Sequence, residues 1–200
     1  MTIVNNSVNC AEREPRACYF IDMSAHFSSP QENVLQLGLH EGMTVGDLGA
    51  GTGHYARAAA GVVGQGGKVY AIDVQEDVLK HLHLNSHPHH QAIIETIWGD
   101  VEKPGGTHLR DATLDAVILA NTLFQIDDRD ALLAEIRRVL KPGGKLLVVD
   151  WAGSYGGIGP AQEYVVPEHD AEALFINGGF HKLKSFRGGS HHYGIIFAAP

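Results

Sequence analysis

The stretch Val45-Gly46-Asp47-Leu48-Gly49-Ala50-Gly51-Thr52-Gly53 joins a short apolar segment to an alanine-rich one. The apolar run Met43–Leu48 is typical of a buried strand, and Tyr55–Val63 is typical of a helix that ends at the following glycines. Glycines at alternate positions between them predict a turn in which the backbone passes close to a ligand, because a side chain would hold the ligand away. The stretch therefore predicts a strand, a ligand-binding turn and a helix.

The spacing of the glycines bears on the kind of ligand. A dinucleotide-binding turn has the pattern Gly-x-Gly-x-x-Gly, in which the third glycine lets the helix N-terminus meet a pyrophosphate. This chain has Gly-x-Gly-x-Gly, with Asp47 directly before the turn. An acid at this place suits a ligand that carries an ammonium group and no phosphate. A nicotinamide dehydrogenase is therefore a distant alternative.

Strands and helices alternate along the chain from about residue 30 onward. Repeated strand–helix units predict an α/β fold, with a parallel sheet covered by helices on both faces. The last two strands are separated by Gly188-Gly189 and predict a hairpin, with an antiparallel strand at an edge of the sheet. The other expected elements are the helices Pro30–Leu39, Gln75–Leu84, Arg129–Leu140 and Glu168–Asn177 and the strands Lys68–Asp73, Ala92–Trp98, Leu114–Ala120, Lys145–Trp151, Phe180–Phe186 and His191–Ala198.

Composition favours a single globular domain over residues 1–200, since 44% of the residues are hydrophobic and 19% are charged. The irregular stretches 1–29 and 152–166 are expected to act as lids. No apolar run approaches the length of a membrane span and no signal peptide is recognisable, so we expect a cytoplasmic protein with Cys10 and Cys18 reduced. The net charge of −8 argues against a large nucleic-acid footprint.

Two further acids lie where strands end. Asp73 closes the predicted strand Lys68–Asp73, and Asp100 follows the next strand. A carboxylate at such a strand end can accept hydrogen bonds from ligand hydroxyl or amino groups. Taken singly, each could instead be a surface turn acid, and Asp47 could be a helix cap.

Together these segments resemble the motifs of the class I S-adenosylmethionine (SAM)-dependent methyltransferases, over residues from about 34 to 198. Val45–Gly53 resembles the first motif, Asp73 the ribose-binding acid of the second, and Gly99-Asp100-Val101 the third, whose acid meets the adenine amino group. Leu114–Asn121 and Leu140–Leu146 resemble the later strand segments. The resemblance implies a Rossmann-like, doubly wound, seven-stranded, mostly parallel sheet and SAM as cofactor. It implies cofactor-binding roles for Asp47, Gly49, Ala50, Gly51, Gly53, Asp73, Val74, Asp100, Val101 and Asn121.

The segment after the predicted strand Leu114–Ala120 bears on the methyl acceptor. It reads Asn121-Thr122-Leu123-Phe124 and lacks the Asn-Pro-Pro-Tyr of amino-group nucleic-acid methyltransferases. The whole pattern is most similar to the small-molecule group that includes the ubiquinone/menaquinone C-methyltransferases. We expect a small or medium-sized acceptor. An RNA or protein methyltransferase and a SAM-binding module without catalysis are the alternatives.

The lids and strand ends supply candidates for the rest of the pocket. His26, Asp150 and Tyr155 are the candidate catalytic residues, because they lie in or beside these irregular parts and can move protons or bind substrate. Other candidates for the walls are Phe27, Trp151, His191, His192 and Tyr193, of which the last two suit a packed strand better. The histidine-rich segment 81–90 has no acid to fix a ligand set, so no metal is predicted.

Overall fold

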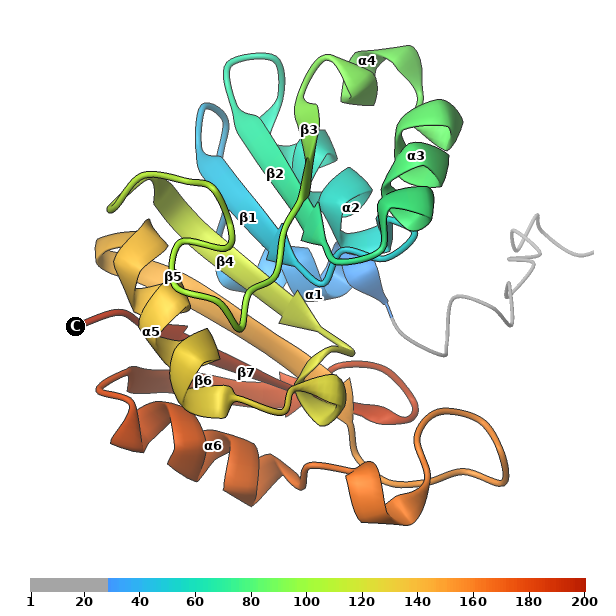
Figure 1. Cartoon of the computed structure of the whole chain (residues 1–200), viewed down its shortest axis with the longest axis vertical. Helices are drawn as coiled ribbons and strands as arrows, with labels where there is room; N and C mark the ends of the chain where they lie inside the picture. Colours follow the sequence, from blue (N-terminus) through green and yellow to red (C-terminus); the bar gives the residue numbers. More distant parts are fainter. Residues whose placement is uncertain (1–28) are drawn as a thin grey trace, which may run out of the picture.

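The computed structural model describes residues 29–200, which form one seven-stranded sheet with helices on both faces (Figure 1). The strands are β1 (Thr44–Leu48), β2 (Lys68–Asp73), β3 (Ile94–Trp98), β4 (Leu114–Ala120), β5 (Leu140–Trp151), β6 (His181–Arg187) and β7 (His192–Ala198). Their order across the sheet is β3-β2-β1-β4-β5-β7-β6. The chain reverses its direction of progress between β1 and β4, which is where ligands bind in open α/β sheets. The predicted α/β fold is confirmed.

Two apolar layers enclose the sheet. The helices are α1 (Pro30–Leu37), α2 (His54–Val63), α3 (Glu76–Asn85), α4 (Pro88–Gln91), α5 (Arg129–Val139) and α6 (Glu168–Asn177), with 3-10 turns η2 (Leu123–Gln125) and η3 (Gln162–Tyr164). One layer packs α1, α2 and Leu82 of α3 against the sheet. The other packs α5 and α6 against the opposite face, around Phe175 and Phe197 (Figure 1).

The C-terminal hairpin forms as predicted, but its antiparallel strand is not at the edge. β7 pairs antiparallel with β5 on one side and with β6 on the other, so β6 is the edge strand. Burial explains the order, since β7 is almost entirely buried and β6 is almost entirely exposed. The apolar strand takes the inner position, and the strand with Lys182 and Lys184 faces water at the edge, where charged side chains discourage pairing with another chain.

Some element boundaries also differ from the predictions. β5 begins at Leu140 rather than Lys145, because the Pro142-Gly143-Gly144 turn lies within a strand whose pairing with β4 shifts register. α1 ends at Leu37, where Gly38 adopts a left-handed conformation. The sequence reading also missed α4, η2 and η3, which are all shorter than five residues.

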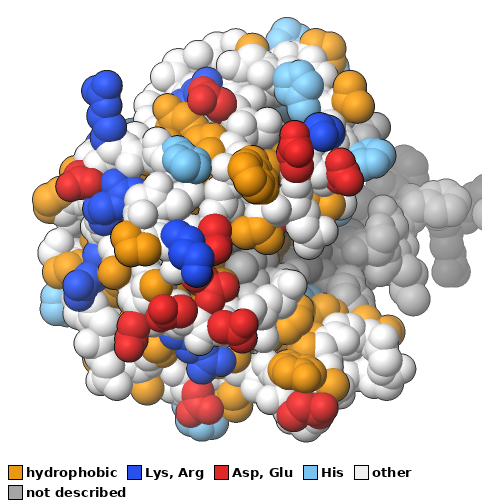
Figure 2. Space-filling model, viewed as in Figure 1, with side chains coloured by type: hydrophobic (Ala, Val, Ile, Leu, Met, Phe, Trp, Pro, Cys, Tyr) orange, Lys and Arg blue, Asp and Glu red, His pale blue; other side chains and the backbone are white. Residues whose placement is uncertain are grey.

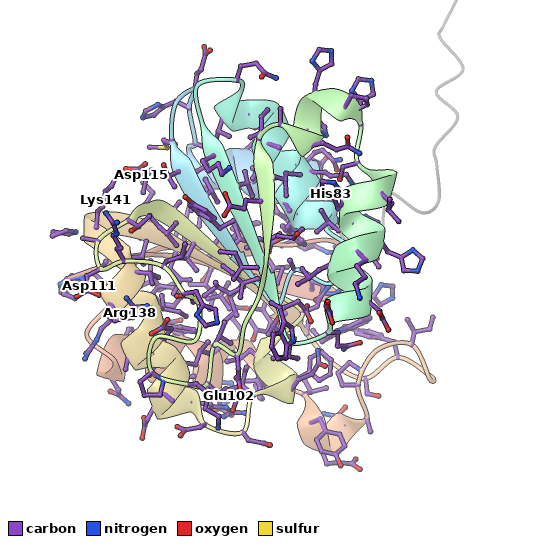
Figure 3. All side chains as sticks on the ribbon, turned by 45° about the horizontal axis from the view of Figure 1, so that its top comes forward. His83, Glu102, Asp111, Asp115, Arg138 and Lys141 are labelled. Atoms are coloured by element: carbon purple, nitrogen blue, oxygen red, sulfur yellow. The ribbon has the colours of Figure 1, made fainter. Side chains whose placement is uncertain are left out.

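A buried carboxylate on α5 anchors the long segment between β3 and β4. Glu135 accepts hydrogen bonds from the backbone N–H groups of Gly105 and Thr107, from the Thr107 hydroxyl at 2.6 Å, and from Arg138. Arg138 also pairs with Asp111, and Figure 3 shows these two beside each other, well away from Glu102. Burial would raise the pKa of Glu135, but these donors outweigh it and hold the pKa at about 2.

We expect Glu135→Gln to destabilise the fold by about 2 kcal/mol, because donors to the charge lose their acceptor. Urea unfolding at neutral pH measures the difference. The folded pKa is depressed, so this stabilisation is present above about pH 4.5 and is lost toward pH 2. Glu95→Gln is the matched control, because Glu95 forms an exposed ion pair with Lys68 and its loss should cost less than about 1 kcal/mol. Equal effects of the two changes would contradict the anchoring role of Glu135.

Candidate functional site

A cavity of about 1120 Å³ opens at the carboxyl ends of β1, β2 and β4, at the switch point of the sheet. Its volume is slightly above the usual range for ligand pockets, roughly 300–1,000 Å³, and leaves room for two ligands. All the predicted cofactor-binding residues except Gly53 line it: Asp47, Gly49, Ala50, Gly51, Asp73, Val74, Asp100, Val101 and Asn121. Gly53 instead caps α2 in a left-handed conformation, and a Cβ there would meet Leu82 at 2.4 Å.

The glycine turn is fixed by the strand beside it. The N–H groups of Gly49 and Ala50 donate to the carbonyl of Ile72, and the N–H of Gly51 donates to Asp73 Oδ2 at 2.8 Å. At Gly49, φ is +72°, and a Cβ would lie 2.3 Å from Thr122 Oγ1. The close neighbour that requires glycine at position 49 is thus a side chain of the protein itself. At Gly51 a Cβ would meet nothing within 4 Å, so this part of the backbone borders open space.

Asp47 is the most unusual charge in the site. Its side chain is buried, with the residue 2% exposed, and within residues 29–200 no group donates a hydrogen bond to its Oδ2 atom. Burial raises the pKa of Asp47 to about 7; the N–H of Ala56 and the charge of Arg57 lower it, and the charge of Asp73 raises it. A buried carboxylate oxygen at the wall of a cavity is suited to a ligand that brings a cation or a donor.

The other two acids stand at neighbouring strand ends. Asp73 is buried at the end of β2, and its carboxylate accepts hydrogen bonds from the N–H groups of Gly51 and Gln75. Each carboxylate oxygen can accept a second hydrogen bond, so ligand hydroxyls can be bound as well. Asp100 is half-buried after β3 and accepts a hydrogen bond from the N–H of Glu102.

The apolar parts of the same wall are also held in place. Val74 lines the cavity although it is 56% exposed, and its carbonyl accepts a hydrogen bond from Trp98 Nε1 at 2.9 Å. Val101, directly after Asp100, is buried. Two apolar side chains beside two acids form a surface that fits a flat base with an amino group, joined to a sugar with hydroxyl groups.

Asn121 lines the opposite side in a strained conformation. Its φ is +56°, its N–H donates to the carbonyl of Val149, and its buried Oδ1 accepts no hydrogen bond from residues 29–200. Asparagine tolerates the left-handed region better than most residues, and such strain recurs at functional sites. Like Asp47, Asn121 therefore offers an acceptor atom for which the folded chain has no donor.

Two of the three candidate catalytic residues, Asp150 and Tyr155, lie among the described residues. His26 and Phe27 are outside the described residues. Asp150 and Tyr155 do not line the cavity; Asp150 is buried behind it, and the Tyr155 ring packs edge-on against His191. Their catalytic roles therefore find no support in this geometry. The other wall candidates pack within the fold: the Trp151 and His192 rings lie 4.4 Å apart, and the Tyr193 hydroxyl donates to the carbonyl of Val166.

The sequence reading missed several residues of the wall. They come from the start of α1, the start of α2 and the end of η2: Ser29, Pro30, Gln31, Glu32, His54, Tyr55, Gln125 and Ile126. Their positions beside Gly53 and Asn121 were a usable signal for His54, Tyr55 and Gln125. The α1 residues could not be found locally, because they reach the cavity through tertiary packing, with Asn33 donating to the Tyr55 hydroxyl and to the carbonyl of Gly188.

The histidine-rich segment covers α3 and α4, away from the residues that line the cavity. His87 and His89 stack with ring centroids 5.1 Å apart. Within residues 29–200, no group of three or more histidine, cysteine or carboxylate side chains is arranged to hold a metal ion. The same residues contain no helix long and apolar enough to cross a membrane.

Comparison with known proteins places the chain in a family. A family model described as a methyltransferase domain matches residues 46–148, just over half of the chain. The chain belongs to this methyltransferase-domain family. The matched segment begins just before the glycine turn and ends within β5, so it contains the acids Asp47, Asp73 and Asp100 of the cavity.

Curated relatives of this chain indicate which group of methyltransferases it is similar to. The ubiquinone/menaquinone biosynthesis C-methyltransferase UbiE of Bordetella avium is 35% identical over 123 residues, which cover 62% of this chain and 46% of the relative. The UbiE protein of Escherichia coli O1:K1 is 31% identical over 115 residues, 58% of this chain and 45% of the relative. The match thus spans less than half the length of these relatives. The predicted resemblance to a class I methyltransferase of this group is confirmed.

Solved structures agree with this placement. A SAM-dependent methyltransferase from Aquifex aeolicus superposes with a TM-score of 0.80 at 28% identity, covering 88% of this chain and 92% of that one. A Haemonchus contortus phosphoethanolamine N-methyltransferase in complex with SAM has a TM-score of 0.69 at 16% identity, covering 86% of this chain and 52% of that one, and shows the shared fold. SAM is the cofactor of this protein. The cavity fits SAM, because Asp47 Oδ2 and Asn121 Oδ1 are buried acceptors beside an open glycine backbone.

Proposed function

We propose that this chain transfers the methyl group of SAM to a small or medium-sized acceptor. The observation that carries the proposal is the convergence of Asp47, Asp73 and Asp100 on one cavity large enough for a cofactor and a second molecule. The names of the curated relatives support a small-molecule acceptor, since each is a methyltransferase of quinone biosynthesis.

Each acid has a distinct part to play in holding the cofactor. Asp47 would accept a hydrogen bond from the ammonium group of SAM, Asp73 from the ribose hydroxyls, and Asp100 from the adenine amino group. Val74 and Val101 would offer apolar surface to the adenine. When bound, SAM supplies a methyl group that its sulfonium has already activated for in-line displacement. The chain contributes alignment and exclusion of water, which are the main tasks of such a site.

The charge of the cavity bears on the acceptor. Within residues 29–200, its lining contains five carboxylates and no lysine or arginine: Glu32, Asp47, Asp73, Asp100 and Glu102. This lining suits the positive sulfonium and ammonium of SAM and disfavours an acceptor rich in phosphate. On the face shown in Figure 2, Lys and Arg side chains are interspersed with Asp and Glu, whereas a nucleic-acid footprint is a continuous basic stripe.

The acceptor side of the cavity is the side away from the nucleoside acids. Apart from the acids and the glycine turn, the cavity is lined by Ser29, Pro30, Tyr55, Gln125 and Ile126 among others, and we infer that these residues face the acceptor. This side therefore combines hydroxyl and amide groups with apolar surface. We infer an acceptor that is uncharged or cationic and that carries both an apolar part and a polar group.

Transfer of a labelled methyl group tests the proposal. Purified protein is incubated with methyl-labelled SAM and fractionated cell extract, and label is expected in a product of low molecular weight. Label in RNA or protein would show that the acceptor is a macromolecule and not a small molecule. Binding of SAM without any labelled product would favour a module without catalysis, and failure to bind SAM in calorimetry would overturn the whole proposal.

A further inference from the structure

The carboxylate of Asp150 lies behind the wall of the cavity and binds the backbone that forms it. Asp150 is 1% exposed near the carboxyl end of β5. Its Oδ2 accepts the N–H of Leu123 at 2.9 Å, and its Oδ1 accepts the N–H of Trp151 at 2.8 Å. The N–H groups of Thr122 and Phe124 also stabilise its charge. Asp150 thus collects the free N–H groups at the start of η2, as a capping side chain does at a helix N-terminus.

The backbone that Asp150 holds is the wall segment Asn121–Ile126, which runs from the strained asparagine to the residue that follows η2. Asn121, Thr122, Gln125 and Ile126 line the cavity. The Thr122 hydroxyl donates to the carbonyl of Ala120, and its side chain occupies the space that a Cβ on Gly49 would need. A shift of the wall segment would therefore move both its own cavity residues and the contact with the glycine turn.

We propose that Asp150 is a positioning residue for SAM binding, whose carboxylate fixes the wall segment against the glycine turn and so sets the affinity for SAM without touching it. The left-handed backbone of Asn121 supports this, because such strain persists only where the surroundings hold it in place. The inference rests on the proposed function, since it requires that the cavity binds SAM.

The surroundings of Asp150 make its hold dependent on ionisation. Burial raises its pKa to about 6, against the backbone N–H groups that lower it. Tyr193 lies directly across on β7, and its pKa is raised by its own burial and then by the charge of Asp150. The charges of Glu168 and Asp170 also raise the pKa of Tyr193, and the charge of Arg129 lowers it. His192, the next residue to Tyr193 on β7, packs on Trp151. The wall segment itself has no titratable side chain. Protonation removes the negative charge of Asp150 and makes one of its oxygens a donor and a weaker acceptor, so its hold on the backbone N–H groups weakens below about pH 6.

Asp150→Asn tests the inference, because it keeps the shape and turns an NH₂ group toward backbone donors. We expect the Kd for SAM, measured by calorimetry at neutral pH, to rise at least about tenfold. Tyr193→Phe is the matched control: it removes the hydroxyl that donates to the Val166 carbonyl from the neighbouring strand position, and should lower thermal stability while leaving the Kd unchanged. An Asp150→Asn protein that is folded and binds SAM as the wild type does would overturn the inference.

The pH profile separates positioning from a general loss of stability. In an Asp47→Asn background, which removes the cavity acid whose pKa is also raised toward neutrality, SAM affinity should fall as the pH drops through about 6, and Asp150→Asn should abolish that part of the pH dependence. Should Asp150→Asn fail to fold, hydrogen exchange of the wild type serves: protection of the Leu123 amide, corrected for intrinsic rate, should fall over the same range. Unchanged protection would refute the inference, whereas absence of SAM binding by the wild type would refute the proposed function.

Discussion

Asp73→Ala is expected to raise the Kd for SAM about 100-fold, which corresponds to about 3 kcal/mol. Two effects contribute to the loss. The alanine removes charge-assisted hydrogen bonds to the ribose hydroxyls, and it frees the N–H groups of Gly51 and Gln75 that the carboxylate holds. The glycine turn then loses its tie to β2 as well. Isothermal calorimetry with purified protein measures the change.

Asp77→Ala is the control for Asp73→Ala. Asp77 lies in the first turn of α3, its side chain is 94% exposed, and it makes a loose pair with Lys80 at 3.6 Å. Its removal lowers the net negative charge by the same amount at nearly the same place in the chain, and should leave the Kd within about twofold. An unchanged Kd in Asp73→Ala would show that the ribose is held elsewhere.

Asp47→Asn should have opposite effects on the free and the SAM-bound protein. Without SAM, we expect the variant to be more stable than the wild type above about pH 7, because it no longer buries a charge with an unsatisfied oxygen. With SAM, we expect a Kd about 100-fold higher, since the ammonium loses its buried partner. Thermal unfolding with and without saturating SAM, together with calorimetry, measures both effects.

The raised pKa of Asp47 determines how the stability difference between Asp47→Asn and the wild type changes with pH. The folded pKa of about 7 exceeds the ordinary value of 3.8, so the folded protein binds more protons and the wild type loses stability as the pH rises through this window. The gap between the variant and the wild type should therefore widen from about pH 4 to about pH 7.

Asp115→Asn is expected to change the stability of the fold in the opposite direction to Asp47→Asn. Burial tends to raise the pKa of Asp115, but Lys141 and the N–H of Thr44 lower it below its ordinary value. Asp115 therefore stabilises the fold at neutral pH, and its loss should destabilise it there while leaving SAM binding intact.

A stability difference between Asp47→Asn and the wild type that does not change with pH would contradict the burial of a charged Asp47.

The cofactor half of the site could be predicted because its determinants are local. A strand, a glycine turn and a helix are consecutive in Val45–Gly53, and Asp73 and Asp100 each follow directly from a strand. The carboxyl ends of parallel strands meet at one edge of the sheet, so position along the chain translates into position in the site. The fold class followed from the same alternation of strands and helices.

The rest of the site depends on contacts between distant residues. Asp150 also ends a parallel strand, so it had the sequence signature of a cavity residue, yet its side chain points to Leu123 and is buried. Nothing local shows that Thr122 fills the space beside Gly49. The position of β7 in the sheet is easier to predict from the sequence. Gly194–Ala199 is apolar and Phe180–Phe186 contains two lysines, which favours the inner position for β7.

The inner position of β7 has a consequence for how the chain reaches its folded state during synthesis. β5 is buried in the finished sheet, and its neighbour on one side is β7, which follows the other six strands of this sheet in the chain. Until β7 pairs, the nascent sheet ends in an apolar, unpaired strand, which is the kind of edge that other chains can join. β6 emerges earlier but waits outside, since it pairs with β7 alone. The pairing of β7 therefore covers the exposed edge of β5 and limits aggregation there, although β7 contributes no side chain to the cavity.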